Sequence, residues 1–315
     1  MKSTSTARAA RILLCAFLLS FPGCRPGTGA DSLSILFTGD VLLDRGVRPI
    51  AEEYGSEYLF QEVSPLFSQA DAVVINLEFP FADTVSPVSK GVIFRADTRW
   101  ASGLADAGVT HAAMANNHTM DQGRRGLAST DRALREAGIV PLGYGNSLSE
   151  QLEPVIIGKG DISVAVFNAC MMTVENWINV DGIPGVCIPS GERLVSSVGA
   201  WHKRHPSDHI VVLLHWGWEF KTEPGIRQSS LARQLVKAGA DAVVGHHPHV
   251  LQPLCEIDGA PVFYSLGNFV FDHSTVEGRR CAIARLVFHQ DGSLDYSAVP
   301  VNIIGNRPVP EVQAE

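Results

Sequence analysis

The sequence predicts an α/β fold in which two packed sheets are flanked by helices. Short apolar runs are typical of buried strands, and several of these runs are too continuous for a sheet with one face in water. Helical patterns lie between them, and alternation of strand and helix indicates an α/β architecture. The C-terminal third is richer in strands, which favours a second sheet. The runs lie at 33–38, 71–76, 110–115, 162–168, 210–215, 241–245 and 261–266.

Three helices are expected between these strands. Asp97 can cap the first helix, which ends at Gly108, because a carboxylate accepts a hydrogen bond from a free N–H at a helix start. The second helix runs from about 123 to 137 and ends at Gly138, and the third ends near Gly239. Glycine is favoured just after a helix because it adopts the left-handed conformation without strain.

The C-terminal third contains two turns of the kind that joins antiparallel strands. Asp-Gly favours a tight hairpin, and it occurs at Asp258-Gly259 and at Asp291-Gly292. The segment 170–190 has no clear period, so we expect a loop over the functional site. The strands at these turns are expected at 252–257, 261–266 and 281–288.

Length and composition bound the number of domains and the classes of partner. With 315 residues, 45% of them hydrophobic, the chain forms one large domain or two small ones with a full core. The net charge is −8 and the pI is about 5.8. No basic patch therefore indicates nucleic acid as a partner.

The N-terminus has the pattern of a secretory signal. Lys2, Arg8 and Arg11 form a positive region, and an apolar stretch from 12 to 21 follows, which is too short for a spanning helix. Cys24 directly after Gly23 predicts a bacterial lipoprotein lipidated at this cysteine; the alternatives are ordinary cleavage or an uncleaved anchor. We expect an exported protein of the cell envelope, with a signal over 1–24, a linker over 25–32, one domain over 33–305 and a tail over 306–315.

Export makes disulfides possible. Cys170 and Cys187 bracket a loop rich in Gly and Pro, and a bridge between them would staple this loop; the alternative is that they are buried thiols. No C-x-x-C spacing occurs, which disfavours a structural zinc site.

Polar residues that can bind metal follow five of the predicted strands. Strand ends in α/β sheets meet in one crevice, so these side chains are expected to converge. Carboxylates, an amide and imidazoles together suit a site for one or two Mn, Fe or Zn ions better than a Ca²⁺ site built from oxygen alone. The stretches are Gly39-Asp40, Asn76-Leu77-Glu78, Asn116-Asn117-His118 with Asp121, His215-Trp216-Gly217 with Glu219, and Gly245-His246-His247-Pro248-His249.

Each of these residues also has an ordinary structural interpretation. Asp40 could belong to a turn, Glu78 could be solvated or could bridge two metals, and His215 could be a buried histidine with one hydrogen bond. The strongest element is His247-Pro248-His249, because two histidines that flank a proline of fixed φ can face one point.

The Asn116-Asn117-His118 run suggests proton chemistry beside a metal. Asn117 can ligate through its amide oxygen, and His118 can act as acid or base. Asp121 can bind the second ring nitrogen of His118 and raise the basicity of the ring. The alternative is that Asn and Asp cap the helix that begins near Gly123.

Four further residues are candidates for binding substrate. Asp44 and Arg45 form either a surface ion pair or a substrate contact. Glu219 could support a ligand, and Asn268 could contact a ligand or cap a turn.

In order along the chain, these motifs resemble the CapA/PgsA family of bacterial capsule and poly-γ-glutamate synthesis proteins. The similarity spans roughly residues 33–290 and adds the run Tyr264-Ser265-Leu266-Gly267-Asn268-Phe269. That family is similar in turn to calcineurin-like metallophosphoesterases, so the resemblance implies a four-layer α/β sandwich with a two-metal site. It implies that His118 and Asp121 form an acid–base pair, and that the metal ligands are Asp40, Glu78, Asn117, His215, His247 and His249.

The chain departs from the phosphoesterase pattern at two positions. Leu42 stands where that pattern has a histidine, and Glu78 replaces the bridging aspartate. One metal subsite would keep Asp40, Glu78 and His249. The other would keep Glu78, Asn117, His215 and His247.

The resemblance implies an exported protein in the synthesis of capsule or another extracellular polymer, poly-γ-glutamate or polysaccharide. Its partners would be the polymer or its precursor and membrane components of a capsule synthesis complex. Whether it is an enzyme stays open: it could be a metal-dependent hydrolase, a periplasmic phosphoesterase, or a scaffold that only binds polymer. His118 with Asp121 favours chemistry, whereas Leu42 favours weaker or altered chemistry.

Overall fold

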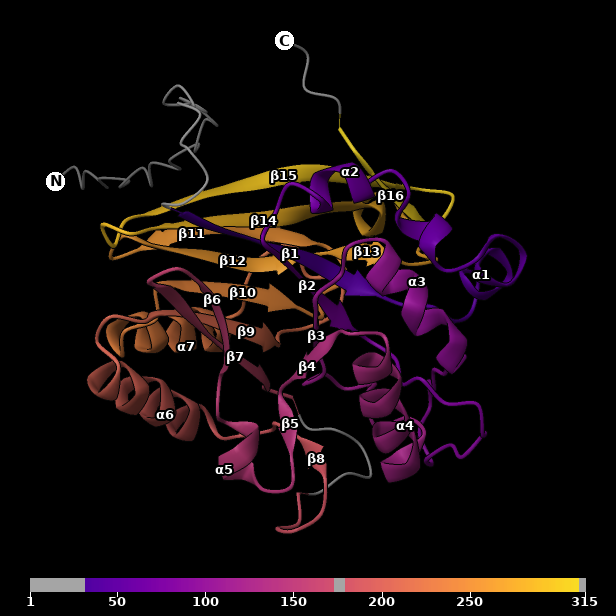
Figure 1. The fold of residues 1–315 in the computed structure, drawn as a ribbon, viewed down its shortest axis with the longest axis horizontal. Coiled ribbons are helices and arrows are strands. Elements are labelled where there is room, and N and C mark those ends of the chain that lie inside the picture. Colours follow the sequence, from indigo (N-terminus) through magenta and orange to yellow (C-terminus); the bar gives the residue numbers. More distant parts are fainter. Residues whose placement is uncertain (1–31, 173–178, 312–315) are drawn as a thin grey trace, which may run out of the picture.

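Two β-sheets lie face to face at the centre of the protein, and helices cover their outer faces (Figure 1). The computed structural model describes residues 32–172 and 179–311. The predicted signal with Cys24 and nearly all of the predicted linker therefore lie outside the described residues.

The first sheet has the strand order β16-β15-β14-β1-β2-β3-β4, and β13 pairs with β1 as well. Strands β1 to β4 are parallel, whereas β14, β15 and β16 are antiparallel neighbours. The carboxyl ends of β1, β2 and β3 therefore meet on one edge. The strands are β1 (Ser32–Val41), β2 (Ala72–Leu77), β3 (His111–Ala113), β4 (Val140–Leu142), β13 (Asn268–Val270), β14 (Arg280–His289), β15 (Leu294–Ile304) and β16 (Arg307–Pro310).

The second sheet has the order β11-β12-β10-β9-β7-β6. Its four central strands are parallel, and β11 and β6 are antiparallel edge strands. A separate two-stranded sheet joins β5 (Tyr144–Gly145) to β8 (Gly185–Val186). The strands of the second sheet are β6 (Val155–Lys159), β7 (Ile162–Cys170), β9 (His209–His215), β10 (Ala242–His246), β11 (Leu251–Ile257) and β12 (Ala260–Leu266).

Alternation along the strands divides the core into layers. In β1, Leu33, Ile35 and Phe37 pack between the two sheets, whereas Leu36 packs toward the helices over the first sheet. Successive side chains of a strand point to opposite faces, and both faces of this sheet are covered, so the run is continuously apolar. This arrangement is the four-layer sandwich that the sequence predicts.

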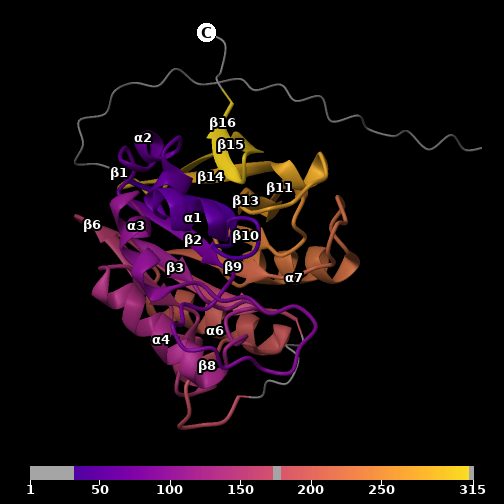
Figure 2. The same cartoon turned by 90° about the vertical axis from the view of Figure 1, so that its right-hand side faces the viewer.

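Helices α1 to α4 cover the first sheet, and α6 and α7 cover the second (Figures 1 and 2). In α4, Leu127 and Leu134 face the first sheet, and in α7, Leu231 and Leu235 face the second. The helices are α1 (Arg48–Tyr54), α2 (Ser64–Phe67), α3 (Ala101–Asp106), α4 (Gly123–Glu136), α5 (Leu148–Gln151), α6 (Gly191–Arg204) and α7 (Ile226–Lys237), with 3₁₀ turns η1 (Glu57–Phe60), η2 (Thr98–Trp100) and η3 (Glu277–Arg279).

The predicted strands and the three predicted helices are present, but the role of Asp97 as a cap was wrong. Asp97 precedes η2, yet its side chain makes no capping hydrogen bond. Its carboxylate instead pairs with Arg48 at 3.3 Å and with Arg95 at 3.2 Å. Two guanidinium groups bind the carboxylate more strongly than one backbone N–H, because both partners are charged.

The predicted hairpins are confirmed. Asp258 and Gly259 have φ of 48° and 87° in the turn between β11 and β12, and Gly292 has φ of 83° between β14 and β15. Positive φ at both Asp and Gly, which the Asp-Gly signal predicts, occurs in the first turn, whereas in the second only the glycine has it.

Of the two alternatives left open for Cys170 and Cys187, the structure shows buried free thiols and no bridge. Their backbones are adjacent, with the Cys170 N–H donating to the Cys187 carbonyl at 2.8 Å. Burial raises the pKa of Cys170 to about 12, which keeps this thiol protonated and unreactive. Residues 173–178 of the predicted loop lie outside the described part of the chain.

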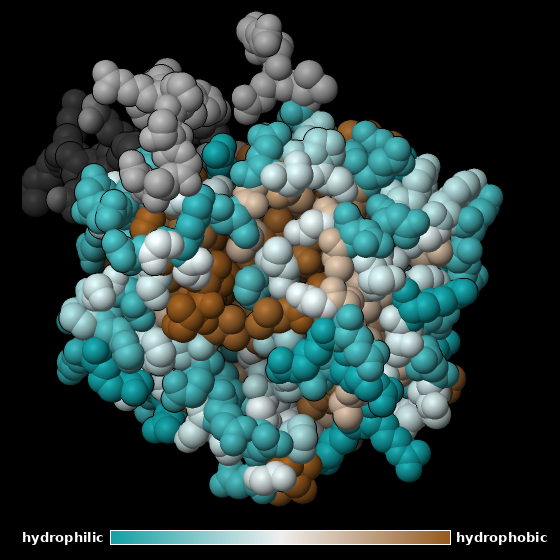
Figure 3. All heavy atoms as spheres, viewed as in Figure 1, coloured by the Kyte–Doolittle hydropathy of each residue, from teal (hydrophilic) through white to brown (hydrophobic). Residues whose placement is uncertain are grey.

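In the described ranges, no helix is both long enough and apolar enough to cross a membrane. On the face drawn in Figure 3, hydrophobic residues gather in the middle and the surrounding surface is mostly hydrophilic.

Candidate metal centre and acid–base pair

Two buried carboxylates stand at the carboxyl ends of β1 and β2. Asp40 pairs in register with Asn76, and Glu78 follows directly after β2. Asp40 and Glu78 are fully buried, and the Asn76 side chain donates to Asp40 Oδ1 at 2.8 Å. Neighbouring parallel strands thus bring together side chains that lie far apart in the sequence.

Gly39 is required because the backbone of the Gly267-Asn268 corner crosses β1 at this point. A Cβ on Gly39 would lie 2.1 Å from the Gly267 carbonyl oxygen. The same carbonyl accepts the Asp40 N–H at 2.9 Å, which fixes the position of Asp40. Any larger residue would push this corner away from the site.

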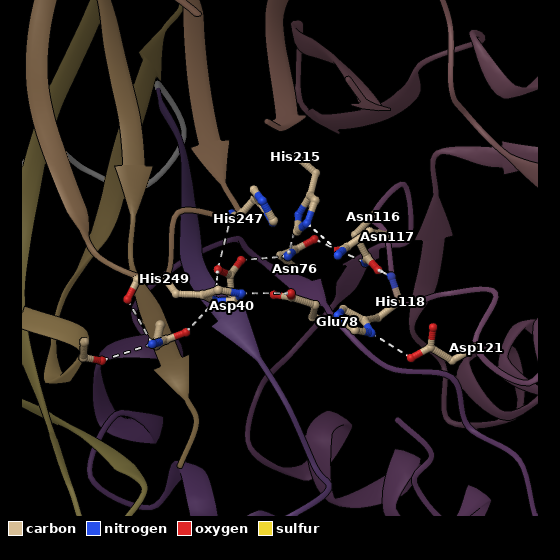
Figure 4. Close-up of polar contacts among 12 residues, drawn as sticks. Asp40, Asn76, Glu78, Asn116, Asn117, His118, Asp121, His215, His247 and His249 are labelled. Atoms are coloured by element: carbon tan, nitrogen blue, oxygen red, sulfur yellow. Dashed lines mark hydrogen bonds and ion pairs between the residues drawn. The ribbon is translucent and has the colours of Figure 1, made fainter. Parts of the chain in front are cut away.

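The second sheet contributes the histidines. His215 ends β9 and lies beside His246 of β10 in register. The turn after β10 holds His247 at φ 97° and His249 at φ 58°, so neither has ordinary strand or helix geometry. Non-glycine residues in such conformations are uncommon and occur often at functional sites. Figure 4 shows the His249 ring pointing at the carboxylates and the His247 ring beside that of His215, with their centroids 4.8 Å apart.

The carboxylates and histidines form two overlapping groups that could hold a metal ion. Within each group, one ligand atom from each residue lies within 4.8 Å of the others. Glu78 belongs to both groups, consistent with its expected bridging position. These groups reflect proximity alone, so the predicted division of the ligands between two subsites stays a prediction. The groups are Glu78, His247 and His249, and Asp40, Glu78 and His215, which together we call the metal cluster.

Several buried atoms of the metal cluster lack a hydrogen-bond partner. Both carboxylate oxygens of Glu78 and Nδ1 of His247 are among the few such side-chain atoms in the described residues. Buried polar atoms in native proteins are almost always paired, and a bound ion is one explanation for an exception. A divalent cation fits these oxygens and imidazole nitrogens.

The electrostatics of the metal cluster also favour a cation. Burial raises the pKa of Glu78 well above its usual value, and the charge of Asp40 raises it further. Burial lowers the pKa of His249, but Glu78 and Asp40 outweigh this effect and raise it to about 10. Without an ion, the His249 imidazolium at 3.2 Å from Asp40 and 3.5 Å from Glu78 balances the two acids, and a bound cation would replace this charge and leave the ring neutral as a ligand.

The other two histidines are neutral. Burial and the charge of His249 lower the pKa of His247 to about 3. Burial and the neighbouring histidines lower the pKa of His215 well below its usual value. Neutral imidazole is the form that binds a metal, so both rings are ready ligands.

His118 and Asp121 form a buried pair beside the metal cluster. His118 Nδ1 lies 2.6 Å from Asp121 Oδ2, and Figure 4 shows the ring between Glu78 and Asp121. The Phe94 ring packs on the imidazole with a centroid distance of 4.1 Å. Helix α4 is preceded by Gln122 and has no side-chain cap, so the alternative role of Asp121 as its cap is excluded.

The two asparagines before His118 have different environments. The Asn117 amide oxygen lies 2.8 Å from His215 Nε2, facing the metal cluster. The Asn116 amide oxygen accepts the backbone N–H groups of His118 and Thr119, both at 3.0 Å, and its amide donates to the Leu77 carbonyl at 2.8 Å. Asn116 therefore folds the turn that presents Asn117 and His118.

Two residues near the ligands are structural. Leu42, which stands where the phosphoesterase pattern has a histidine, is buried in the apolar cluster under the first sheet. Its side chain has no atom that could bind a metal. His246 donates from Nε2 to the Thr38 carbonyl at 2.9 Å and joins the two sheets next to the site. Its imidazole faces a backbone carbonyl and not the metal cluster.

The candidate substrate residues differ in burial and in their contacts. Asp44 binds Arg48 at 3.0 Å and the Arg95 N–H at 2.8 Å, which braces the loop after β1. Arg45 is about half exposed and pairs with Asp272 at 3.1 Å. Arg45 thus leaves part of its guanidinium open to solvent, as an anion-binding group needs.

Asn268 and Glu219 complete the set. The Asn268 amide oxygen lies 2.9 Å from His249 Nδ1, and its amide donates to the His249 carbonyl at 3.0 Å. Asn268 thus orients a ligand ring. Glu219 is exposed on the loop after β9, beside Trp218.

A cavity of ≈ 400 Å³ lies on this loop, lined by Trp218, Lys221, Thr222, Glu223, Gly225 and Gln228.

The sequence placed Asn76 and Asn116 only within stretches of metal-capable residues, without an individual role, and it indicated no role for Lys90. For the asparagines a signal existed, since both follow apolar runs at strand ends. For Lys90 no signal existed, because it lies in a stretch without strand or helix and meets the site only through the fold. Its ammonium lies 2.9 Å from Asp121.

Comparison with known proteins places the chain among capsule-related proteins. It is 32% identical over 283 residues to the PGA biosynthesis protein CapA of Bacillus subtilis (strain 168), covering 89% of this chain and 74% of that protein. It is 31% identical over 290 residues to the capsule biosynthesis protein CapA of Bacillus anthracis, covering 90% and 71%. A probable polyglutamine synthesis accessory protein of Mycobacterium tuberculosis is 28% identical over 293 residues, covering 79% and 77%.

Among solved structures, the fold is similar to that of the Haemophilus influenzae NAD nucleotidase NadN, with a TM-score of 0.50 and 14% identity. This likeness covers 86% of the chain but only 56% of that structure, and it concerns the fold alone. It supports the metallophosphoesterase-like fold that the sequence predicts. Residues 34–273 match the family described as bacterial capsule synthesis protein PGA_cap, and the chain belongs to this family.

Proposed function

We propose that the protein acts in the synthesis of capsule or poly-γ-glutamate at the cell envelope, through metal-dependent hydrolytic or transfer chemistry. Relatives named for PGA and capsule biosynthesis support the process. The observation that carries the chemistry is the buried His118–Asp121 pair beside carboxylate and imidazole atoms that have no hydrogen-bond partner.

Asp40, Glu78, His215, His247 and His249 would hold one or two divalent ions, with the amide oxygen of Asn117 as a further ligand. Mn, Fe and Zn all suit a set of carboxylates and imidazoles. A bound ion would supply Lewis acidity at the reacting group.

The chain itself contributes a proton carrier and an anion-binding group. Asp121 accepts from Nδ1 of His118, so Nε2 is left to take a proton from the reacting group or return it. The partly exposed guanidinium of Arg45 would bind a carboxylate or phosphate of the substrate.

A scaffold that only binds polymer would have no use for this pair. Burying an aspartate against an imidazole requires several compensating contacts, and a binding surface gains nothing from them. We therefore favour catalysis over a purely structural role.

Metal analysis of the purified protein, together with a screen on phosphoesters and on poly-γ-glutamate, tests this proposal. We expect a bound divalent ion and a metal-dependent reaction on at least one substrate class. Turnover of phosphoesters alone would favour a periplasmic phosphoesterase. Metal-free protein that fully restores polymer production in a deficient strain would leave the scaffold as the function.

We also propose that the chain is exported and held at a membrane through Cys24, as its sequence context suggests. The Cys24→Ser variant should then move from the membrane fraction to the soluble fraction outside the cytoplasm. A variant that stays with the membrane as the wild type does would favour an uncleaved anchor instead.

A further inference from the structure

The segment 86–94 is fastened onto the turn that carries His118 and Asp121. Within this segment, the Val88 N–H donates to the Asp121 carbonyl at 3.0 Å, and the Ser86 N–H donates to the Gln122 side chain at 2.8 Å. Near its end, the Phe94 N–H donates to Asp121 Oδ2 at 2.7 Å. The two segments are therefore one unit, although about thirty residues separate them.

Lys90 is the charged residue through which this segment reaches the acid–base pair. Its ammonium lies 2.7 Å from the Asn117 carbonyl oxygen, 2.9 Å from Asp121 Oδ1 and 3.2 Å from His118 Nδ1. The side chain is only 9% exposed. The Lys90 ammonium thus lies close to Asn117, which is beside the metal cluster, and to both His118 and Asp121.

The shortest contact assigns the proton on the imidazole. Asp121 Oδ2 can only accept, so at 2.6 Å Nδ1 of His118 must carry the hydrogen. Lys90 then cannot donate to the same nitrogen. Its hydrogen bonds go to the Asn117 carbonyl and to Asp121 Oδ1, and they fix both ends of the turn.

Three donors hold the Asp121 carboxylate: the Lys90 ammonium on Oδ1, and the Phe94 N–H and His118 on Oδ2. A carboxylate held on both oxygens cannot rotate, so the direction of its hydrogen bond to His118 is fixed. This direction determines where Nε2 of the imidazole points.

We propose that Lys90 is a positioning residue, which locks Asp121 and the Asn117 peptide so that His118 presents Nε2 to the metal cluster. The inference rests on the proposed function in assigning His118 a proton-transfer role, but the geometric claim stands independently. Partners of this kind typically change activity about 10- to 100-fold when they are removed.

The chain offers a matched control for the loss of one lysine from one ion pair. Lys159 in β6 pairs with Asp71 at 2.8 Å and has a 35% exposed side chain. Asp71 lies at the amino end of β2, the end opposite to the site. Lys159→Met therefore removes the same charge and a similar contact without touching the site.

The experiment compares Lys90→Met with Lys159→Met in the full-length protein. Three quantities are measured: bound metal per chain, the ¹⁵N shifts of the His118 imidazole in histidine-labelled protein, and polymer production in a complemented strain. The His118 signals are assigned by their loss in His118→Gln. Lys90→Arg serves as the conservative variant, and Lys90→Gln replaces Lys90→Met if that variant does not fold.

We expect Lys90→Met to retain its metal, shift the His118 signals and reduce polymer production about tenfold or more, with partial recovery in Lys90→Arg. Lys159→Met should change none of these. Unshifted His118 signals in a folded Lys90 variant would overturn the inference, whatever the activity. If the signals shift but polymer production is unaffected in Lys90→Met and in His118→Gln, the positioning role stands and the proposed catalysis fails.

Discussion

The two halves of the candidate site differ in how their buried polar atoms are satisfied. In the metal cluster, both oxygens of Glu78 and one nitrogen of His247 have no hydrogen-bond partner. In the half around the acid–base pair, Asp121 accepts three hydrogen bonds, and the Asn116 amide oxygen accepts two backbone N–H groups. One half has unused ligand atoms and the other is saturated.

The difference indicates that one half of the site binds a cation and the other half transfers a proton. Unpaired buried oxygens and nitrogens are costly unless something else binds them, so the metal cluster is suited to a cation. A saturated network holds its side chains in one arrangement, which suits a group that must transfer a proton in a fixed direction. Variants in the two halves should therefore fail in different ways.

The largest effect is expected for His118→Ala. A general acid or base typically contributes about 10²–10⁴-fold in rate, so activity should fall by that factor while metal content stays near that of the wild type. Activity on the substrate found in the screen and metal per chain are measured together. If this variant fully restores polymer production in a deficient strain, His118 is not a catalytic residue.

Asp121→Asn should give a smaller loss of the same kind. The amide offers one acceptor oxygen and a weaker hold on the imidazole, so a loss of about 10- to 100-fold is expected. The measurement is the same rate assay, with metal content as the control. A loss larger than that of His118→Ala would mean that Asp121 does more than orient the ring.

His247→Ala should reverse the pattern and act on the metal. A bound ion stabilises the folded state by about 2.7 kcal/mol when its free concentration is 100 times its Kd. Added Mn²⁺ should therefore raise the Tm of the wild type but have little effect on the variant. Wild-type metal stoichiometry in His247→Ala would contradict the assignment and make the histidines a packed cluster.

The smallest effect concerns the pH dependence of stability, and it tests a residue of the fold outside the candidate site. Burial lowers the pKa of His111, in β3, from 6.5 to about 4. As the pH falls, His111 is protonated in the unfolded chain before it is protonated in the folded protein. The free energy of unfolding therefore decreases as the pH drops from about 6.5 toward 4. This loss of stability at low pH should be smaller in His111→Gln. The measurement is the Tm of metal-free protein as a function of pH. An unchanged pH profile would assign the acid loss to other groups.

The sequence could predict those parts of the fold and site whose signals are local. Continuous apolar runs mark strands that are buried on both faces, and polar residues directly after them mark the site edge. Asp40, Glu78, His215 and His247 follow such runs, and the structure brings them together. Which of them share an ion stays a prediction.

What the sequence could not predict depends on contacts between distant segments. Asp97 has the position of a cap, but Arg48, 49 residues away, competes for its carboxylate. Lys90 reaches Asp121 across 31 residues from a segment without periodicity. The crossing of Gly267 over Gly39 likewise joins residues at opposite ends of the chain. No local pattern encodes such contacts.

The direction of β1 has a consequence for how the protein would stand at a surface. The strand begins at Ser32, and its ten residues, at about 3.3 Å each, extend roughly 30 Å toward the site at their far end. If the segment before Ser32 holds the chain at a membrane, as proposed, the lipid lies behind the domain. The metal cluster, at the far end of β1, then lies on the side of the domain away from the lipid.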